Sequence, residues 1–593
     1  MVKVGEYKVA GMYQGGFSTL DPNKYSPSGV YTGYRIPSGQ LGAPTKPDTA
    51  NQIAQVHMLL NQGIIPIEIG ALNPEVFDQI PKQHFKEINR MTKLTGAKIS
   101  VHAPLIEASG IGEQGYTESA RLLAENQLLD VVQKSAEASD TGGMSITIHG
   151  AAKIPGTEYK IIQEGKDKGK KVEEKLFVVN RETGKLSAAF EEEQKFLPGT
   201  KDWKKGIIHT PREQIDLLNS TEWDNSISQL MHHKEDAEAR IHENLPLVPM
   251  ELVKTLYEHP EKARLLEPTQ RAAYSRLVAA DQFLKDTSQS LSSLFNKAYK
   301  FGTDEDKAKL RGASEQFETD LKKGGYLLGK AEAMENLLTT LKEMEPQAYQ
   351  PVEDFAIDKS ATTFANVAFK AFDKLKDKAP NINVENFFPG TAFSHGKELD
   401  KLIVAARNKF VEQAVAKGYS KSTAEEKAQE LIGVTLDVGH LNIVRKHGFK
   451  DKDILKEVEE IAKHVKHVHL TDNFGYSDSH LPPGMGNVPI KDILARLEQE
   501  GFEGSKIIEA GGFVQQFGVS PLPYTLEAFG SQMYGADSPY WNQTVGLQQN
   551  YPGGFGQMLP QTNYNLRGGG FSQLPLELGG SKQGQGQEMG KAA

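Results

Sequence analysis

The sequence contains no cysteine among its 593 residues. Disulfide bonds, cysteine nucleophiles and thiolate metal sites are therefore excluded, and a metal site has to use His, Asp and Glu side chains. No apolar run approaches the roughly 18 residues that indicate a membrane span. The N-terminus also lacks a basic start followed by an apolar stretch, so we predict no secretory signal. We expect a cytoplasmic protein with no membrane association.

An excess of positive charge is missing as well. The chain has 68 Lys and Arg against 77 Asp and Glu, a formal net charge of −9. Such a chain has no overall field that attracts nucleic acid, although a local basic groove remains compatible with it. Its 38% hydrophobic and 24% charged residues are typical of a globular protein with added polar segments.

Short runs rich in Val and Ile alternate with amphipathic helical patterns along much of the chain. Strands that alternate with helices predict a parallel α/β sheet, and eight of them favour a closed (β/α)8 TIM barrel over an open sheet. The predicted strands cover residues 8–12, 64–71, 98–105, 145–151, 381–388, 434–441, 466–472 and 505–512.

One gap is too long for a single crossover helix. Between the fourth and fifth predicted strands, a hairpin pattern around NRETGK precedes long charged helices with many Glu/Lys pairs four residues apart. We interpret this region as a large, mainly helical insertion, either a stabilising or oligomerising decoration or a lid that gates the substrate. The expected domains are 1–151 (strands 1–4), 152–355 (the insertion), 356–534 (strands 5–8) and 535–593 (a disordered low-complexity tail rich in Gly and Gln).

A long segment with little regular pattern, residues 14–48, follows the first predicted strand. Tyr34 and Arg35 lie in it among Gly, Ser and Pro. Loops at the carboxyl ends of barrel strands carry function, so these side chains could stack on a sugar or a base. A packed surface loop explains the segment equally well.

Potential metal ligands fall at the ends of the predicted strands or in the loops just after them. In a parallel barrel these ends meet at one rim, where converging carboxylates would repel one another unless cations neutralised them. Imidazole and carboxylate ligands suit zinc, manganese or iron. The residues concerned are His102, His149, Glu385, Asp437, His440, His469, Asp478, His480 and Glu509.

Several strings around these residues resemble one superfamily, that of the xylose isomerase-like sugar isomerases and epimerases and of endonuclease IV (AP endonuclease family 2). The resemblance covers about residues 1–150 and 356–534, and leaves out the insertion and the tail. The strings are VHAPL, TIHGA, NVENFFPG, TLDVGHLN, HVHLTDN, SDSHLPPGMGN and IIEAGG.

The resemblance implies up to three divalent ions, Zn²⁺ or else Mn²⁺, because nine residues hold three zinc ions in endonuclease IV and all nine positions match here. It implies one ion on His102, His149 and a shared Glu385, and another on His440, Asp478 and His480. The remaining ion would be held by Glu385, Asp437, His469 and Glu509. In the isomerase branch that last site suffices, with Glu385 and Glu509 as acid and base.

Three functions follow from these observations. The complete ligand set favours an endonuclease IV-like phosphodiester hydrolase acting on DNA with an abasic site. The acidic charge, and Leu105 where endonuclease IV has an aromatic residue that contacts DNA, favour a sugar or sugar-phosphate isomerase or epimerase. A non-catalytic scaffold that binds a protein partner through the insertion or the tail is disfavoured, because no ligand is missing.

Three further residues have more ambiguous signals. Glu68, on the second predicted strand, is interpreted as a partner that orients a metal ligand or as a structural residue. Asp472 and Asn473 directly follow the strand that carries His469, and are interpreted as either substrate contacts or structural residues.

Overall fold

The computed structural model describes residues 36, 38–152, 154–196, 204–324, 327–518 and 520–529. The chain divides into two compact units, one formed by residues 1–173 with 353–593 and the other by residues 174–352. The second unit is narrower than the expected insertion, because the segment 152–173 groups with the first. The predicted tail, 535–593, lies outside the described residues.

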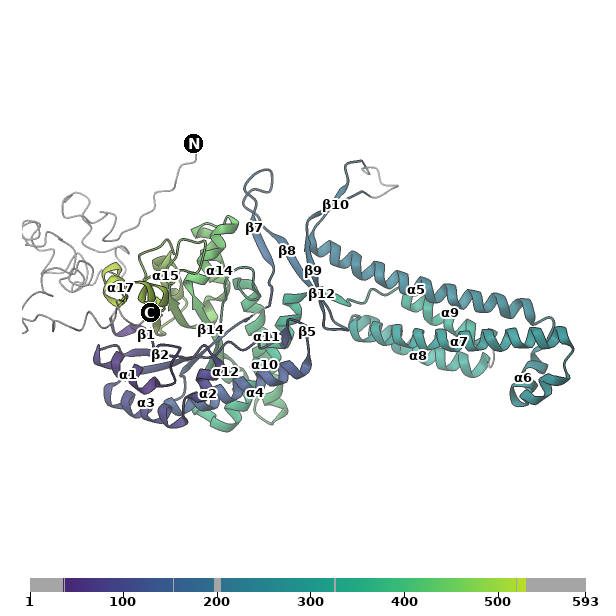
Figure 1. The fold of residues 1–593 in the computed structure, drawn as a ribbon, viewed down its shortest axis with the longest axis horizontal. Helices are drawn as coiled ribbons and strands as arrows, with labels where there is room; N and C mark the ends of the chain where they lie inside the picture. Colours follow the sequence, from purple (N-terminus) through teal and green to yellow (C-terminus); the bar gives the residue numbers. More distant parts are fainter. Residues whose placement is uncertain are drawn as a thin grey trace, which may run out of the picture. The chain divides into compact units, whose positions relative to one another are not determined.

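The first unit is built around a closed barrel of eight parallel strands, which confirms the predicted (β/α)8 fold (Figure 1). Every neighbouring pair is parallel, and Glu385 stands opposite His149 in the register between the fourth and fifth strands. The ring runs through β1 (Leu41–Pro44), β2 (Pro66–Gly70), β3 (Lys98–His102), β6 (Ser145–His149), β13 (Asn381–Glu385), β14 (Ile432–Asp437), β15 (Val465–Leu470) and β16 (Lys506–Ile508).

Helices surround this barrel, and their sequences explain where they begin and end. In α3 (Lys82–Thr95), Phe85 and Ile88 are buried, and the helix ends where Gly96 adopts a left-handed φ of 72°. Other helices of this unit are α1 (Gln52–Asn61), α2 (Pro74–Gln79), α4 (Glu118–Ser135), α10 (Val352–Leu375), α11 (Gly396–Ala416), α12 (Lys421–Leu431), α13 (Val438–Asn442), α14 (Asp451–Ile461), α15 (Ile490–Gln499), α16 (Gly511–Phe517) and α17 (Leu522–Ala528).

The first barrel strand is not the predicted one. The barrel is closed by β1, which pairs with β16 and β2, whereas residues 8–12 lie outside the described residues. The sequence of β1, LGAP, is short and has no β-branched residue, so it gives little strand signal. Its glycine is required by packing, because a Cβ on Gly42 would lie 2.4 Å from the carbonyl oxygen of Pro66.

The second unit confirms a mainly helical insertion between the fourth and fifth barrel strands. Thr210 and Glu213 form a capping box at the start of α5 (Pro211–Asn244). The predicted hairpin is also present, because β8 (Lys171–Asn180) pairs antiparallel with β9 (Leu186–Glu191). The bundle has its own core, which includes Trp223, Leu277 and Leu338. Its other helices are α6 (Met250–Glu258), α7 (Pro268–Phe301), α8 (Asp304–Gly324) and α9 (Leu328–Lys342).

None of the helices that the structure describes is both long and apolar enough to cross a bilayer.

Candidate metal centre

The predicted ligands come from strand ends of the barrel and the loops that follow them. His102, His149 and Glu385 end β3, β6 and β13, and Asp437 ends β14. The rest lie in α13, in β15, in the loop after β15 and directly after β16, and they are His440, His469, Asp478, His480 and Glu509. Their side chains form four overlapping groups, and within each group one ligand atom per residue lies within 4.8 Å of the others. Three are the sets that the resemblance implies, and the fourth consists of His102, His469 and Glu509.

The first group joins two histidines to one carboxylate. The Nε2 atoms of His102 and His149 lie 3.2 and 3.0 Å from Oε2 of Glu385, whose side chain is fully buried. Burial alone would lower the pKa of His102, but the Glu385 carboxylate raises it to about 9. Burial would raise the pKa of Glu385, but His469 and His149 hold it well below its ordinary value.

The second group shares Glu385 and adds Asp437, His469 and Glu509. Nδ1 of His469 lies 2.8 Å from Oε1 of Glu385 and 3.5 Å from Oε1 of Glu509. Asp437 also caps α13, because its Oδ1 accepts hydrogen bonds from the backbone N–H groups of Gly439 and His440. This use of Oδ1 leaves Oδ2 of Asp437 without a hydrogen-bond partner among the described residues.

The third group consists of His440, Asp478 and His480. Oδ2 of Asp478 lies 3.3 Å from Nε2 of His440 and 2.8 Å from Nε2 of His480. Burial lowers the pKa of His440, but Asp437 and Asp478 raise it to about 10. His480 has a φ of 44°, a left-handed conformation that is uncommon for a residue other than glycine.

Three of the histidines are fixed in one orientation by backbone carbonyls. Because a carbonyl oxygen only accepts, Nδ1 of each ring must donate, and the lone pair on Nε2 then faces the ligand group. The Nδ1 atoms of His102, His440 and His480 lie 3.2, 3.0 and 3.1 Å from the carbonyl oxygens of Ala103, Asn386 and Glu509.

The donor set fits divalent ions. Buried carboxylate oxygens are costly when they have no partner, yet Oδ2 of Asp437 and Oδ1 of Asp478 have no hydrogen-bond partner within the part of the chain that the structure describes. Cations accept such lone pairs. A mixture of imidazole and carboxylate ligands with no thiolate suits Zn²⁺ or Mn²⁺.

The residues whose roles the sequence left open do not share one environment. Glu68 on β2 contacts His469 from inside the barrel. Asp472 accepts hydrogen bonds from the backbone N–H groups of Asn473, Gly484 and Val488, so it organises the loop rather than facing the ligands. The side chain of Asn473 donates to the carbonyl oxygen of Gly439. The predicted contacts Tyr34 and Arg35 lie outside the described residues.

Sequence reasoning missed two features near the centre. His467, two residues before His469 on β15, is buried beside Glu68, and the two-residue spacing on one strand face was the available signal. Phe387 and Phe388 stack on each other with ring centroids 4.2 Å apart. Phe387 also packs edge-on against His149 at 5.0 Å.

A closed barrel of eight parallel strands with flanking helices defines the class of the molecule, a (β/α)8 barrel with a candidate metal centre at the rim where its strands end. Residues 413–517 match the family model of the xylose isomerase-like TIM barrels. This match confirms the resemblance seen in the sequence.

Curated relatives match over short stretches. An uncharacterized protein of Methanocaldococcus jannaschii is 33% identical over 78 residues, which is 13% of this chain and 25% of that protein. Fructoselysine 3-epimerase of Shigella flexneri is 27% identical over 56 residues, 9% of this chain and 20% of the enzyme. The matched stretches therefore span a quarter or less of the length of these relatives.

Solved structures also resemble the chain. A D-tagatose 3-epimerase-like protein gives a TM-score of 0.35 at 11% identity, covering 82% of this chain and 98% of that one. The 3-keto-D-glucoside 4-epimerase of E. coli gives a TM-score of 0.32 at 10% identity, covering 82% of this chain and 97% of that one.

Proposed function

We propose that this chain is a metal-dependent hydrolase that cleaves phosphodiester bonds, with DNA containing an abasic site as the first substrate to test. One observation carries the proposal, namely that the predicted ligands form three groups of the implied composition, two of which share Glu385 while the third lies in the segments that follow β14 and β15. A single-metal enzyme has no need of the His440, Asp478 and His480 group. The retention of all three groups is what a trinuclear hydrolase requires.

Each part of the chain has a role in this reaction. Divalent ions at the three groups would supply Lewis acidity, which polarises a phosphoryl oxygen and lowers the pKa of water. Glu385 joins two of the groups through its two carboxylate oxygens. The carbonyl oxygens behind His102, His440 and His480 hold these rings in one tautomer, so that the site is preorganised before substrate arrives.

A second function, sugar isomerisation or epimerisation, is supported by the likeness to fructoselysine 3-epimerase. It would use the group of Glu385, Asp437, His469 and Glu509 with one ion. Glu385 and Glu509 would act as acid and base. Small sugars or sugar phosphates are then the substrates.

The variant His480→Ala separates the two functions, because it removes a ligand from the third group alone. A hydrolase should bind about three zinc ions per chain, cleave a duplex at an abasic site, and lose about 10²-fold or more in rate with this variant. An epimerase should bind one ion and keep its activity on a panel of ketoses and sugar phosphates. Elemental mass spectrometry of the purified full chain gives the ion count. Absence of cleavage by a chain that holds three ions would exclude this substrate.

A further inference from the structure

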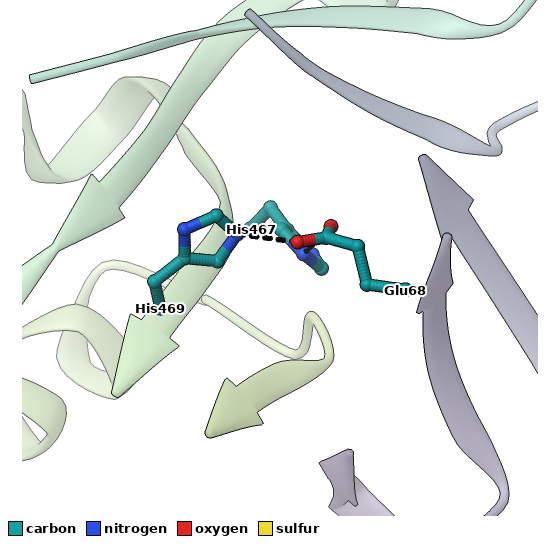
Figure 2. Close-up of side chains that lie close together, drawn as sticks. All are labelled: Glu68, His467 and His469. Atoms are coloured by element: carbon teal, nitrogen blue, oxygen red, sulfur yellow. Dashed lines mark hydrogen bonds and ion pairs between the residues drawn. The ribbon is translucent and has the colours of Figure 1, made fainter. Parts of the chain in front are cut away.

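Glu68 lies inside the barrel between two histidines of the same strand. His467 and His469 are two residues apart on β15, so their side chains point to the same face, toward the barrel interior. Figure 2 shows the Glu68 carboxylate reaching across from β2 to both rings. The exposed fractions of Glu68, His467 and His469 are 0, 1 and 0%, so no solvent competes with these contacts.

The two oxygens of Glu68 have different partners. Oε2 lies 2.9 Å from Nε2 of His467 and accepts a hydrogen bond from the Ser100 hydroxyl at 2.8 Å. Oε1 lies 2.9 Å from Nε2 of His469, within ion-pair distance but without the alignment of a hydrogen bond. His467 and Ser100 therefore hold the carboxylate in place, and its other oxygen is directed at a single ring.

That ring differs from the other predicted ligands. The carbonyl-bound histidines present Nε2 to their ligand groups, whereas His469 presents Nδ1 to Glu385 and Glu509. Neutral imidazole has one lone pair, so His469 can serve as a ligand through Nδ1 only if its proton is on Nε2. A negative charge beside Nε2 stabilises a proton there. Oε1 of Glu68, 2.9 Å from Nε2 of His469, is the carboxylate oxygen placed to do so.

We propose that Glu68 is a positioning residue for the metal centre: it fixes the Nε2–H tautomer and the ring orientation of His469, and His467 and Ser100 fix Glu68. This inference rests on the proposed function only in requiring that the centre holds a metal. Outer carboxylates of this kind change metal affinity by about 10- to 100-fold in other proteins.

The same three side chains also lie close enough together to form a ligand set of their own. Two contacts argue against that use. The Nε2 atom of His467 is already hydrogen-bonded to Glu68, and the Nδ1 atom of His469 is directed at the neighbouring group. An ion bound to these three side chains would need a lone pair on Nε2 of His469 while Nδ1 of the same ring serves the neighbouring group, and a neutral imidazole has only one lone pair.

The test is the zinc affinity of the full-length variant Glu68→Gln, measured by competition with a chromophoric chelator. We expect the largest zinc dissociation constant, that of the weakest site, to rise about 10- to 100-fold. The number of ions bound at saturation should stay unchanged. Glu68→Asp, which keeps the charge on a shorter side chain, should recover part of the affinity and serves if the Gln variant does not fold. In ¹⁵N spectra of the zinc-loaded protein, the imidazole signals that disappear in the variant His469→Gln identify His469. In the wild-type spectrum these signals should show a protonated Nε2.

The matched control is Glu125→Gln, which neutralises another buried carboxylate. Glu125 is 3% exposed and pairs with Arg121 and Lys370, away from the ligand groups, so its loss should lower stability without changing zinc affinity. Unchanged zinc affinity in Glu68→Gln, an equal loss in both variants, or one ion fewer at saturation would each overturn the inference. A wild-type chain that binds no zinc would overturn the proposed function too, whereas a zinc effect without phosphodiester cleavage would leave the inference standing and overturn only the hydrolase.

Discussion

Nε2 of His440 and Oδ2 of Asp478 lie 3.3 Å apart, although 38 residues separate them in the chain. The contact brings a short helix after β14 against the long loop after β15. The third ligand group thus depends on how two separate loops fold, whereas the first group is built from strand ends that the barrel fixes directly. The third group should accordingly be the most sensitive to changes in loop structure.

Asp472 is the residue that organises the second of these loops, so Asp472→Asn should remove the third ion. Gly484 and Val488 donate to different oxygens of the carboxylate, and an Asn side chain keeps only one acceptor oxygen, so its NH2 group would face one of these two backbone N–H groups. We expect a zinc count of two rather than three by elemental mass spectrometry. Asp453→Asn, at a capping box in α14, should lower stability and keep the count at three. Three ions in both variants would show that the loop does not need Asp472.

Gly439 lies between two ligands, and Gly439→Ala should destabilise the protein by about 1–3 kcal/mol. A Cβ there would lie 1.9 Å from Oγ1 of Thr471, which itself donates a hydrogen bond to Asp437. Either the turn or the threonine has to move. Urea unfolding measures the effect, and Gly112→Ala, where a Cβ would meet nothing within 4 Å, is the control. Equal stabilities for the two variants would contradict the packing argument.

Phe388 should contribute to substrate binding rather than to the chemical step. Its ring stacks on Phe387 and lies edge-on to His440 at 6.1 Å, while 37% of the residue is exposed. Stacking on a substrate ring would make Phe388→Ala raise KM about tenfold with little change in kcat, and Phe388→Trp should preserve KM. Leu94→Ala, which removes an exposed apolar side chain from α3, is the control. A fall in kcat at constant KM would contradict this role.

His464 should make the stability of the barrel depend on pH. Burial and the nearby Arg407 lower the pKa of His464 to about 4, from an ordinary value of 6.5. The unfolded chain then binds more protons than the folded one between about pH 4 and 6.5, so stability is lost as pH falls through that window. The slope should reach at most about 1.4 kcal/mol per pH unit. His464→Gln should flatten it in urea unfolding series, and an unchanged slope would assign the dependence to other groups.

Seven of the eight barrel strands could be predicted because their Val and Ile runs are long enough to carry a strand signal. For β14 the prediction began two residues late, since Ile432 and Gly433 continue directly from α12. The first strand was wrong for a different reason. Gly42 is required because the neighbouring strands leave no room for a Cβ at this position. A glycine contributes nothing to a hydrophobic pattern, so the strand gives little signal in the sequence.

The candidate ligands could be predicted because strand ends of a parallel barrel must converge whatever the loops do. The role of Glu68 required more than the position of its strand. Its contact with His469 depends on the depth of each side chain inside the barrel, which follows from the register of strands that are not neighbours in the ring. No single-strand pattern contains that information.

The two ends of the helical insertion are joined by strand pairing, since Asn180 in β8 stands opposite Tyr349 in β12 (Tyr349–Pro351). The chain therefore leaves and re-enters through adjacent residues, as it would in an ordinary hairpin. A tight turn that joined residues 180 and 349 directly would therefore keep β8 paired with β12 while removing the helical bundle.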